Sequence, residues 1–370
     1  LVRKASKIKA IAITGSSGKT SLKELLSQCL NKIASTSYSK KSFNNKFGVP
    51  ISLFNIQKNN IFGVFEVGMD KKGEINHLTK LIMPDLGVIT NISYAHIKNF
   101  KNLYEIALAK SEMINNIVSG GSIVLNKDDK FFNFLKNKAL KKKLKIISFS
   151  EKNNADIRMI KITRKKSNYL LILKIGNNIK KFIIKESLKF YIVNILATIA
   201  VISNYTDVQS LKENFFYNFK IPKGRGDFSK IKLNNKLINI VDESYNSNPL
   251  SLEFAINNFN KMNVSSKSKN ILLGDMLELG KFSKNLHKEA AKIVNKSKIN
   301  KVFVYGKDIK ETFNKIKTQK KGKILNSKKE IISLMKNDLR DNDYLMVKAS
   351  NATGLNNVIS QIKLGQLNAI

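Results

Sequence analysis

A glycine-rich segment, Thr14-Gly-Ser-Ser-Gly-Lys-Thr-Ser21, lies between a short apolar run and a stretch with helical spacing. Glycines let backbone N–H groups curl around phosphate oxygens, and the N-terminus of a following helix adds a favourable dipole. In such a loop Lys19 would reach the β- and γ-phosphates of ATP, and the Thr20 hydroxyl would hold Mg²⁺. The full Walker pattern has glycine where this chain has Ile13. The predicted ATP-binding loop comprises Thr14, Gly15, Ser16, Ser17, Gly18, Lys19, Thr20 and Ser21.

Four further side chains could complete a metal site. Glu66 ends a short apolar run, Asn91 follows another, His96 lies in the loop after it, and Lys110 lies in a stretch with helical spacing. Ligands of α/β folds bind at the carboxyl ends of strands. Mg²⁺ prefers oxygen ligands and tolerates one imidazole. A glutamate or histidine such as Glu66 or His96, taken singly, more often has a structural role. Whether either one binds a metal must therefore be judged from the motifs around it.

The surrounding residues predict an α/β fold with two domains. Strand-like and helix-like patterns alternate over the first 125 residues, which is typical of a parallel sheet flanked by helices. The predicted strands are 7–14, 61–67, 86–90 and 122–125, and the predicted helices are 19–33 and 103–117. Residues 157–184 predict antiparallel strands with turns at 165–167 and 176–178, followed by helices at 188–204 and 208–219.

The segment Ile221-Pro-Lys-Gly-Arg-Gly226 is the best boundary between the domains, because proline and glycine interrupt regular structure. A second alternating series follows it. Its predicted strands are 237–242, 270–273, 301–305 and 343–347, with helices at 250–259 and 283–294 among the connections. We therefore expect a central P-loop ATPase domain with a mostly parallel sheet in residues 1–222, and a C-terminal Rossmann-like, doubly wound domain in residues 223–370.

The composition admits two interpretations of the net charge of +39. A basic P-loop ATPase acting on nucleic acid is one. A general drift toward lysine is the other, and it is favoured because only five of the 66 basic residues are arginine. The chain has no apolar run of about 18 residues, so we expect no membrane span. The single cysteine, Cys29, excludes an internal disulfide, fits a reducing cytoplasm, and is expected to be buried in packing.

Several motifs, taken together and in order, resemble the Mur ligase family, whose members form amide bonds with ATP. The phosphate loop and the Asn-rich segment Ser42-Phe-Asn-Asn-Lys-Phe-Gly-Val-Pro50 match the central domain. So do the two metal-binding segments, Phe65-Glu-Val-Gly-Met69 and Asn91-Ile-Ser-Tyr-Ala-His96. Ala109-Lys-Ser-Glu112 matches the segment whose lysine is carbamylated in the family. Gly224-Arg225, Asp242-Glu-Ser-Tyr-Asn-Ser-Asn-Pro249 and Leu273-Gly-Asp-Met-Leu-Glu-Leu-Gly280 match the C-terminal domain.

The resemblance implies a role for each matching residue. Lys19, His96 and Lys110 would be catalytic; Thr20, Glu66, His96 and a carbamylated Lys110 would hold two Mg²⁺ ions. Asn194, Arg225 and Asp242 would join the phosphate loop in binding ATP. The residues implied to bind substrate are Asn44, Asn45, Tyr245, Asn246 and Asn248.

The last two C-terminal segments resemble most closely the family member that joins D-alanyl-D-alanine to UDP-N-acetylmuramoyl-tripeptide through an acyl phosphate, in peptidoglycan precursor synthesis. The resemblance implies a cytoplasmic monomer with no specific nucleic-acid partner. A related amide ligase such as a folylpolyglutamate synthase, the nucleic-acid ATPase, and a non-catalytic remnant that binds a partner are the alternatives.

Three departures from the family pattern accompany the resemblance. Phe190-Tyr191 stands where the family usually has His-Asn, which affects part of the expected adenine contact. Lys348-Ala-Ser-Asn351 stands in place of Lys-Gly-Ser-Arg. Only 13 residues precede Thr14, so we expect the family's N-terminal UDP-sugar-binding domain to be missing from this chain.

Overall fold

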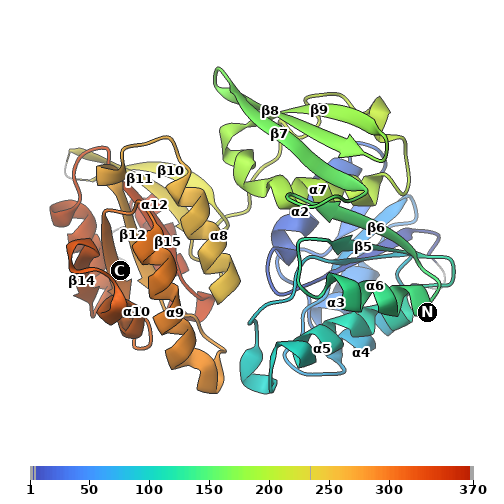
Figure 1. Cartoon of the computed structure of the whole chain (residues 1–370), viewed down its shortest axis with the longest axis horizontal. Coiled ribbons are helices and arrows are strands. Elements are labelled where there is room, and N and C mark those ends of the chain that lie inside the picture. The colour runs from blue at the N-terminus through green and yellow to red at the C-terminus, as the bar shows by residue number, and fades with distance from the viewer. Residues whose placement is uncertain (1–2, 4–5, 234, 367–370) are drawn as a thin grey trace. The chain divides into compact units, whose positions relative to one another are not determined.

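A computed structural model describes residues 3, 6–233 and 235–366 of the chain. The chain forms two compact units, Leu1–Lys220 and Ile221–Ile370, and each has its own sheet (Figure 1). The α/β fold class predicted from the sequence is confirmed, with a mostly parallel sheet in the first unit and a doubly wound sheet in the second.

The first unit is built on a nine-stranded sheet in the order β2-β3-β1-β4-β5-β6-β7-β8-β9. β1 lies between β3 and β4 and is parallel to both. The parallel strands are β1 (Lys9–Thr14), β2 (Thr36–Tyr38), β3 (Phe62–Glu66), β4 (Leu86–Ile89), β5 (Ser122–Asn126) and β6 (Lys145–Ser150). Because the strand order reverses at β1, a crevice is expected at its carboxyl end, where α/β folds bind ligands.

Helices cover both faces of this sheet (Figure 1). One face carries α2 (Lys19–Leu30) and α7 (Ile192–Ile202), which pack against each other. The other carries α4 (Glu74–Ile82), α5 (Leu103–Asn116) and α6 (Phe132–Lys141), with the short α3 (Gly48–Phe54) beside α4. Coverage on both faces explains why β1, β3 and β4 are apolar and buried along nearly their whole length.

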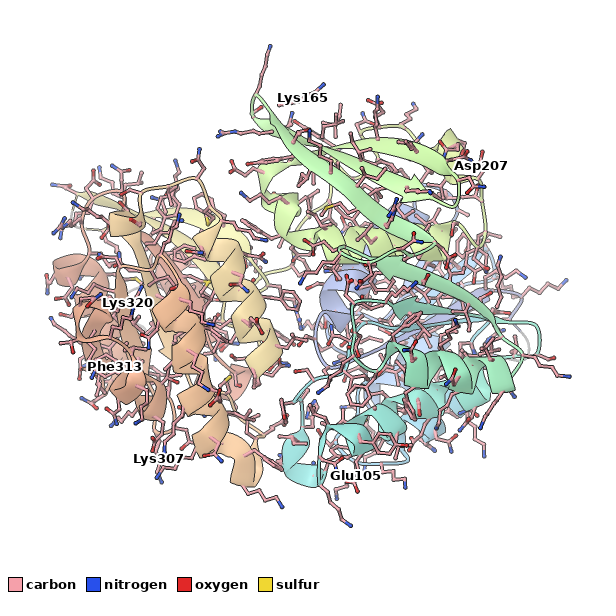
Figure 2. The ribbon with its side chains drawn as sticks, viewed as in Figure 1. Glu105, Lys165, Asp207, Lys307, Phe313 and Lys320 are labelled. Carbon is pink, nitrogen blue, oxygen red and sulfur yellow. The ribbon has the colours of Figure 1, made fainter. Side chains whose placement is uncertain are left out.

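An antiparallel extension completes the first sheet, as the sequence predicts. It consists of β7 (Ile157–Lys165), β8 (Asn168–Ile175) and β9 (Asn178–Lys185). Lys165 lies at the tip of the β7–β8 hairpin and points away from the sheet (Figure 2).

The helix predicted at 208–219 is wrong. Only Val208–Ser210 is helical there, as a single 3-10 turn. The residues that follow run beside the edge strand β9, where the Glu213 carbonyl accepts a hydrogen bond from the Ile183 N–H at 2.8 Å. Phe216 is fully buried, with its ring 5.1 Å from that of Phe182. Burial of Phe216 against Phe182 and the hydrogen bond to β9 outweigh the local helical pattern, and the segment forms a series of turns. The helix predicted at 188–204 begins instead as a 3-10 helix, Glu186–Tyr191, before α7.

The second unit has a six-stranded sheet in the order β10-β11-β15-β12-β13-β14. β10 (Asp227–Leu233) is the antiparallel edge. The parallel strands are β11 (Lys236–Glu243), β12 (Lys269–Gly274), β13 (Lys301–Tyr305), β14 (Lys321–Leu325) and β15 (Tyr344–Lys348). α8 (Pro249–Asn260), α9 (Ser283–Lys296) and α10 (Lys310–Lys315) pack side by side, while α11 (Lys328–Ser333) and α12 (Leu355–Lys363) share a separate apolar core with the strands.

The polar residues around His287 predict a position on the surface of a helix, and the structure shows this prediction to be wrong. Its side chain is fully buried on the inner side of α9. Nε2 accepts a hydrogen bond from the Met276 N–H at 3.1 Å, and Nδ1 lies 2.9 Å from the Ser283 carbonyl. Because both ring nitrogens contact groups inside the unit, His287 has a structural role.

Among the described residues, the helices are all too short or too polar to cross a membrane. Cys29 lies buried on α2, as predicted. Burial raises the pKa of its thiol to about 12, partly offset by the charge of Lys32.

We expect the Cys29 thiol to resist alkylation in the folded protein, because the thiolate is the nucleophile and a pKa of about 12 leaves it almost wholly protonated at pH 8. Iodoacetamide labelling followed by mass spectrometry would show no adduct in native protein and one adduct after unfolding in guanidinium. Rapid labelling of native protein at pH 8 would contradict the buried position.

Candidate active site

The phosphate loop connects β1 to α2 and depends on two glycines. Gly18, with φ of 81°, is the N-cap residue of α2. Gly15 has φ of 145°, and a Cβ atom there would lie 1.9 Å from the Thr90 hydroxyl oxygen. The carboxyl end of β4 therefore approaches the loop so closely that only glycine fits at position 15.

Residues at the end of β4 hold the loop in shape. The Thr90 hydroxyl donates to the Ser17 carbonyl at 2.7 Å. The Asn91 side chain accepts from the Ser17 N–H at 2.9 Å and donates to its carbonyl at 3.1 Å. The Ser16 hydroxyl exchanges hydrogen bonds with the backbone of Ser93, at 2.9 and 2.8 Å. Asn91 was a predicted candidate. The sequence patterns did not single out Thr90, which ends the predicted strand 86–90, or Ser93, which follows it.

Thr20, Glu66 and Asn44 meet at the carboxyl ends of β1 and β3. The Glu66 Oε1 atom accepts from the Thr20 hydroxyl at 3.0 Å and from the Asn44 amide at 2.8 Å. Glu66 is only 1 % exposed, and its Oε2 atom has no hydrogen-bond partner among the described residues. A buried carboxylate oxygen left without a donor, beside a threonine hydroxyl, fits a divalent cation such as Mg²⁺.

Lys19 and Lys110 bring two amines to the same site. The Lys19 ammonium donates to the Gly15 carbonyl at 2.8 Å. Lys110, on α5, is only 1 % exposed. Burial holds the pKa of the Lys110 amine well below its ordinary value, and the nearby Lys19 charge lowers it further. An uncharged amine is the form that reacts with CO₂, so the environment of Lys110 suits carbamylation.

Asn44 and Asn45 are neighbours with different contacts. Asn44 faces Glu66, and its side chain lies so close to Gly68 that a Cβ there would be 2.9 Å from the Asn44 Cγ atom. The Asn45 side chain instead accepts from the N–H groups of Phe47 and Gly48, at 3.1 and 2.9 Å. Asn45 therefore shapes the turn that begins α3.

His96 pairs with a residue that the sequence patterns missed. Its Nδ1 atom lies 2.9 Å from the Asp70 carboxylate, and its backbone adopts a left-handed φ of 57°. A carboxylate on one ring nitrogen fixes the orientation of the other, which is the arrangement common around metal-bound imidazoles.

The remaining predicted residues of the first unit lie near the loop. The Asn194 side-chain oxygen, on α7, is 3.5 Å from the position of a Cβ built on Gly18. Ser21 is half-buried in the first turn of α2. Asn194 thus lies beside the phosphate loop.

In the second unit, the segment around Arg225 is bound to the loop after β11. The Arg225 guanidinium stacks on the Tyr245 ring at 4.3 Å, and the Tyr245 N–H donates to the Gly224 carbonyl at 3.1 Å. Gly224 has φ of 71°, and a Cβ there would lie 3.0 Å from that of Tyr245. The two predicted residues, Arg225 and Tyr245, are therefore brought together.

Asp242 and Asn248 have partners inside the second unit. The buried Asp242 carboxylate accepts from the Ser244 N–H at 3.1 Å and from the Lys363 ammonium at 2.7 Å. Asn248 is the N-cap of α8 and exchanges two hydrogen bonds of 2.9 Å with Ser251. Both side chains thus have structural contacts in addition to the ligand roles that the sequence suggested.

Lys348, the first residue of the segment Lys348–Asn351 that differs from the family pattern, is also buried. Its ammonium donates to the carbonyl of Asn246 and lies 3.5 Å from the Glu243 carboxylate. Burial lowers the pKa of Lys348 and raises that of Glu243, and the attraction between the two charges opposes both shifts. The lysine therefore holds the loop that carries Tyr245 and Asn246.

The carboxyl ends of β12, β13 and β14 border a separate cavity of about 420 Å³ within the second unit. Asp275 and Tyr305 line it together with Lys307 and Lys310. In both units, then, polar side chains gather at the end of the sheet where parallel strands finish.

Comparison with known proteins decides the family. Residues 13–202 match the Mur ligase middle domain, and residues 228–351 match the Mur ligase glutamate ligase domain. The chain belongs to the Mur ligase family. The family resemblance expected from the sequence motifs is therefore confirmed.

Named relatives of this Mur ligase chain span nearly all of it. It is 31 % identical over 365 residues to the UDP-N-acetylmuramoyl-tripeptide–D-alanyl-D-alanine ligase of Buchnera aphidicola from Baizongia pistaciae, covering 98 % of this chain and 76 % of the relative. It is 27 % identical over 357 residues to the ligase of that name from Bacillus subtilis, covering 96 % and 76 %.

Solved structures share the fold. MurF from Acinetobacter baumannii superposes with a TM-score of 0.86 at 24 % identity, over 98 % of this chain and 78 % of that one. MurF from Thermotoga maritima in complex with ADP gives 0.85 at 22 % identity, over 100 % and 83 %. The folylpolyglutamate synthase of Mycobacterium tuberculosis gives a lower TM-score of 0.69 at 11 % identity, over 98 % and 92 %.

We expect Gly15→Ala to weaken ATP binding at least about tenfold, because the new methyl group collides with the Thr90 hydroxyl that holds Ser17. Gly120→Ala is a matched control, since Gly120 also has a positive φ, of 72°, but nothing lies within 4 Å of a Cβ there. Titration with a fluorescent ATP analogue would compare the two, and equal affinities in both variants would contradict the close approach of β4.

Proposed function

We propose that this chain is an ATP-dependent ligase that joins D-alanyl-D-alanine to UDP-N-acetylmuramoyl-tripeptide, releasing ADP and phosphate, in peptidoglycan precursor synthesis. The observation that carries the proposal is the 31 % identity, over 98 % of the chain, to a relative named for that reaction. The phosphate loop beside Glu66 and Lys110 supplies the chemistry that such a ligase requires.

Amide formation from a carboxylate and an amine is unfavourable in water, so the carboxylate needs activation. In the proposed reaction the carboxylate of the tripeptide attacks the γ-phosphorus of ATP, ADP leaves, and an acyl phosphate forms. The dipeptide amine then attacks the acyl carbon, the C–O bond to phosphate breaks, and the amine loses a proton. Phosphoryl transfer depends mainly on positioning and charge neutralisation.

The residues of the first unit meet those needs. The loop N–H groups and Lys19 hold the phosphates, and Lys19 leaves the Gly15 carbonyl to do so. Thr20, Glu66 and His96 are the proposed Mg²⁺ ligands, and bound Mg²⁺ would supply further charge neutralisation at the phosphate oxygens. Holding both substrates in one site makes the second attack effectively unimolecular, worth up to about 7–11 kcal/mol in favourable cases.

We propose that Lys110 acts as a carbamate. The uncharged amine adds to the carbon of CO₂ and loses one proton. Where a protonated lysine would repel a cation, the resulting carbamate would be an anionic ligand for a second Mg²⁺ ion. The lowered pKa of Lys110 and its burial beside Lys19 support this step.

The other assigned roles stay predictions. They are nucleotide contacts for Asn194, Arg225 and Asp242, substrate contacts for Asn44, Asn45, Tyr245, Asn246 and Asn248, a monomeric state and a cytoplasmic location. Among them Asn194 has direct geometric support, because it lies beside Gly18.

Phosphate release from ATP and Mg²⁺ tests the proposed function. With UDP-N-acetylmuramoyl-tripeptide present, we expect release to depend on added D-alanyl-D-alanine, and Lys19→Met to abolish it because the γ-phosphate loses its cation. ATP hydrolysis that ignores the dipeptide but is stimulated by DNA at physiological salt would overturn the assignment and favour a nucleic-acid ATPase.

Carbamylation of Lys110 has its own test. We expect the intact protein in bicarbonate at neutral pH to carry about 44 Da of extra mass that acid removes, and Lys110→Ala to lose both this mass and ligase activity. Transfer to CO₂-free buffer should lower activity reversibly. A Lys110→Ala enzyme as active as the native one would rule out the carbamate.

A further inference from the structure

Lys23 is a fully buried lysine one turn after Lys19 and Thr20 on α2. Its side chain is 0 % exposed, while it carries a charge that the mechanism above does not use. A buried ammonium is costly unless other groups compensate it, so its contacts need an explanation.

The Lys23 ammonium contacts three separate groups. It lies 3.0 Å from the Glu24 carboxylate and 3.8 Å from the Glu66 Oε2 atom, and it donates a hydrogen bond to the backbone carbonyl of Lys41. Glu24 is therefore its nearer charged partner. This leaves Glu66 Oε2 beside a cation but without a hydrogen-bond donor.

Lys41 belongs to the loop of residues 39–45, which delivers Asn44 to Glu66. The Ser39 N–H donates to the Val64 carbonyl at 3.0 Å, and the Gly68 N–H donates to the Asn44 carbonyl at 2.8 Å. These bonds fasten the two ends of the loop to β3 and to the residues just after it. The bond from Lys23 fastens its middle to α2, the helix that begins at the phosphate loop.

We propose that Lys23 is a positioning residue that couples the phosphate-loop helix to the loop 39–45, so that Asn44 holds the Glu66 carboxylate in place for the divalent cation. In this role Lys23 acts through Asn44 and Glu66 and not by contact with the nucleotide or the substrate. The effect of Lys23 on turnover rests on the proposed function. Its effect on the arrangement of Asn44 and Glu66 does not, because that arrangement can be measured without catalysis.

An ammonium suits this position better than an apolar side chain. A methionine could fill the same space, but the Lys41 carbonyl would lose its donor and Glu24 its cation. The loop would then keep its two ends and lose the bond at its middle. Asn44, three residues after Lys41, would be the side chain that moves.

Lys23→Met tests the coupling, and Lys32→Met is its matched control. The Lys32 ammonium also donates to a backbone carbonyl, that of Phe215, just after the end of α2 and away from Glu66. We expect Lys23→Met to speed amide hydrogen exchange at residues 40–45 at least about tenfold and to weaken Mn²⁺ binding, followed by electron paramagnetic resonance, by a similar factor. ATP binding in EDTA should stay within about twofold of the native value, since the phosphate loop is intact.

The double variant Lys23→Met/Asn44→Ala separates positioning from a general structural role. If Lys23 acts through Asn44, adding Lys23→Met to Asn44→Ala should change Mn²⁺ affinity by less than about twofold. Should Lys23→Met fold poorly, Lys23→Gln replaces it, because it also removes the charge and shortens the reach to Lys41.

Unchanged exchange at residues 40–45, fully additive effects on Mn²⁺ affinity, or the same changes in Lys32→Met would overturn the inference. None of these measurements needs ligase activity. The positioning role can therefore fail while dipeptide-dependent phosphate release stands, and that release can fail while the coupling is observed.

Discussion

The buried carboxylate of Glu66 requires partners, because a charge removed from water without compensation is too costly to keep. Those partners come from three places: the first turn of α2, the loop 39–45, and Lys23 further along α2. They can meet only because β1 and β3 are parallel neighbours that end at the same edge of the sheet. The order of the strands therefore determines where the site lies, which is the edge of the sheet where the carboxyl ends of β1 and β3 meet.

The same constraint shapes the phosphate loop. With β4 on the other side of β1, Thr90, Asn91 and Ser93 arrive next to Ser16 and Ser17 and set their backbone by hydrogen bonds. Lys19 and Thr20 then follow on a helix whose start is fixed. A ligand that enters this loop meets groups already in place, which limits the reorganisation that phosphoryl transfer would otherwise need.

Sequence patterns predicted those helices and strands whose secondary structure is determined by their own residues. The strands β1, β3, β4 and β13 are short apolar runs, and α2 and α8 lie where helical spacing predicted helices at 19–33 and 250–259. The loop motif also singled out Lys19 and Thr20, and the end of an apolar run singled out Glu66, because each lies near a strand end that can be read locally.

Patterns failed where a distant residue decides the outcome. Residues 211–219 have helical spacing but form turns, with Phe216 buried and a backbone hydrogen bond to β9. His287 has polar neighbours in sequence yet accepts a hydrogen bond from the Met276 N–H in another segment. Lys23 looks like any other lysine in a chain that has 66 basic residues, so its burial beside Glu66 could not be read without the fold. Likewise, Asn44 and Asn45 are adjacent and chemically identical, and only the three-dimensional structure assigns one to Glu66 and the other to a turn.

Lys363, in the last turn of α12, donates to Asp242 on β11 and to Asp227 on β10, at 2.7 and 2.8 Å. Burial alone would lower the pKa of Lys363, but its hydrogen bonds to the two carboxylates raise it on balance. One carboxylate on each of the strands that open the second unit is thus paired with a single cation from the last helix described, α12. During synthesis on the ribosome, Asp227 and Asp242 are made more than a hundred residues before their cation. The second unit therefore cannot complete this charge pairing until α12 has been synthesised, more than a hundred residues after β11.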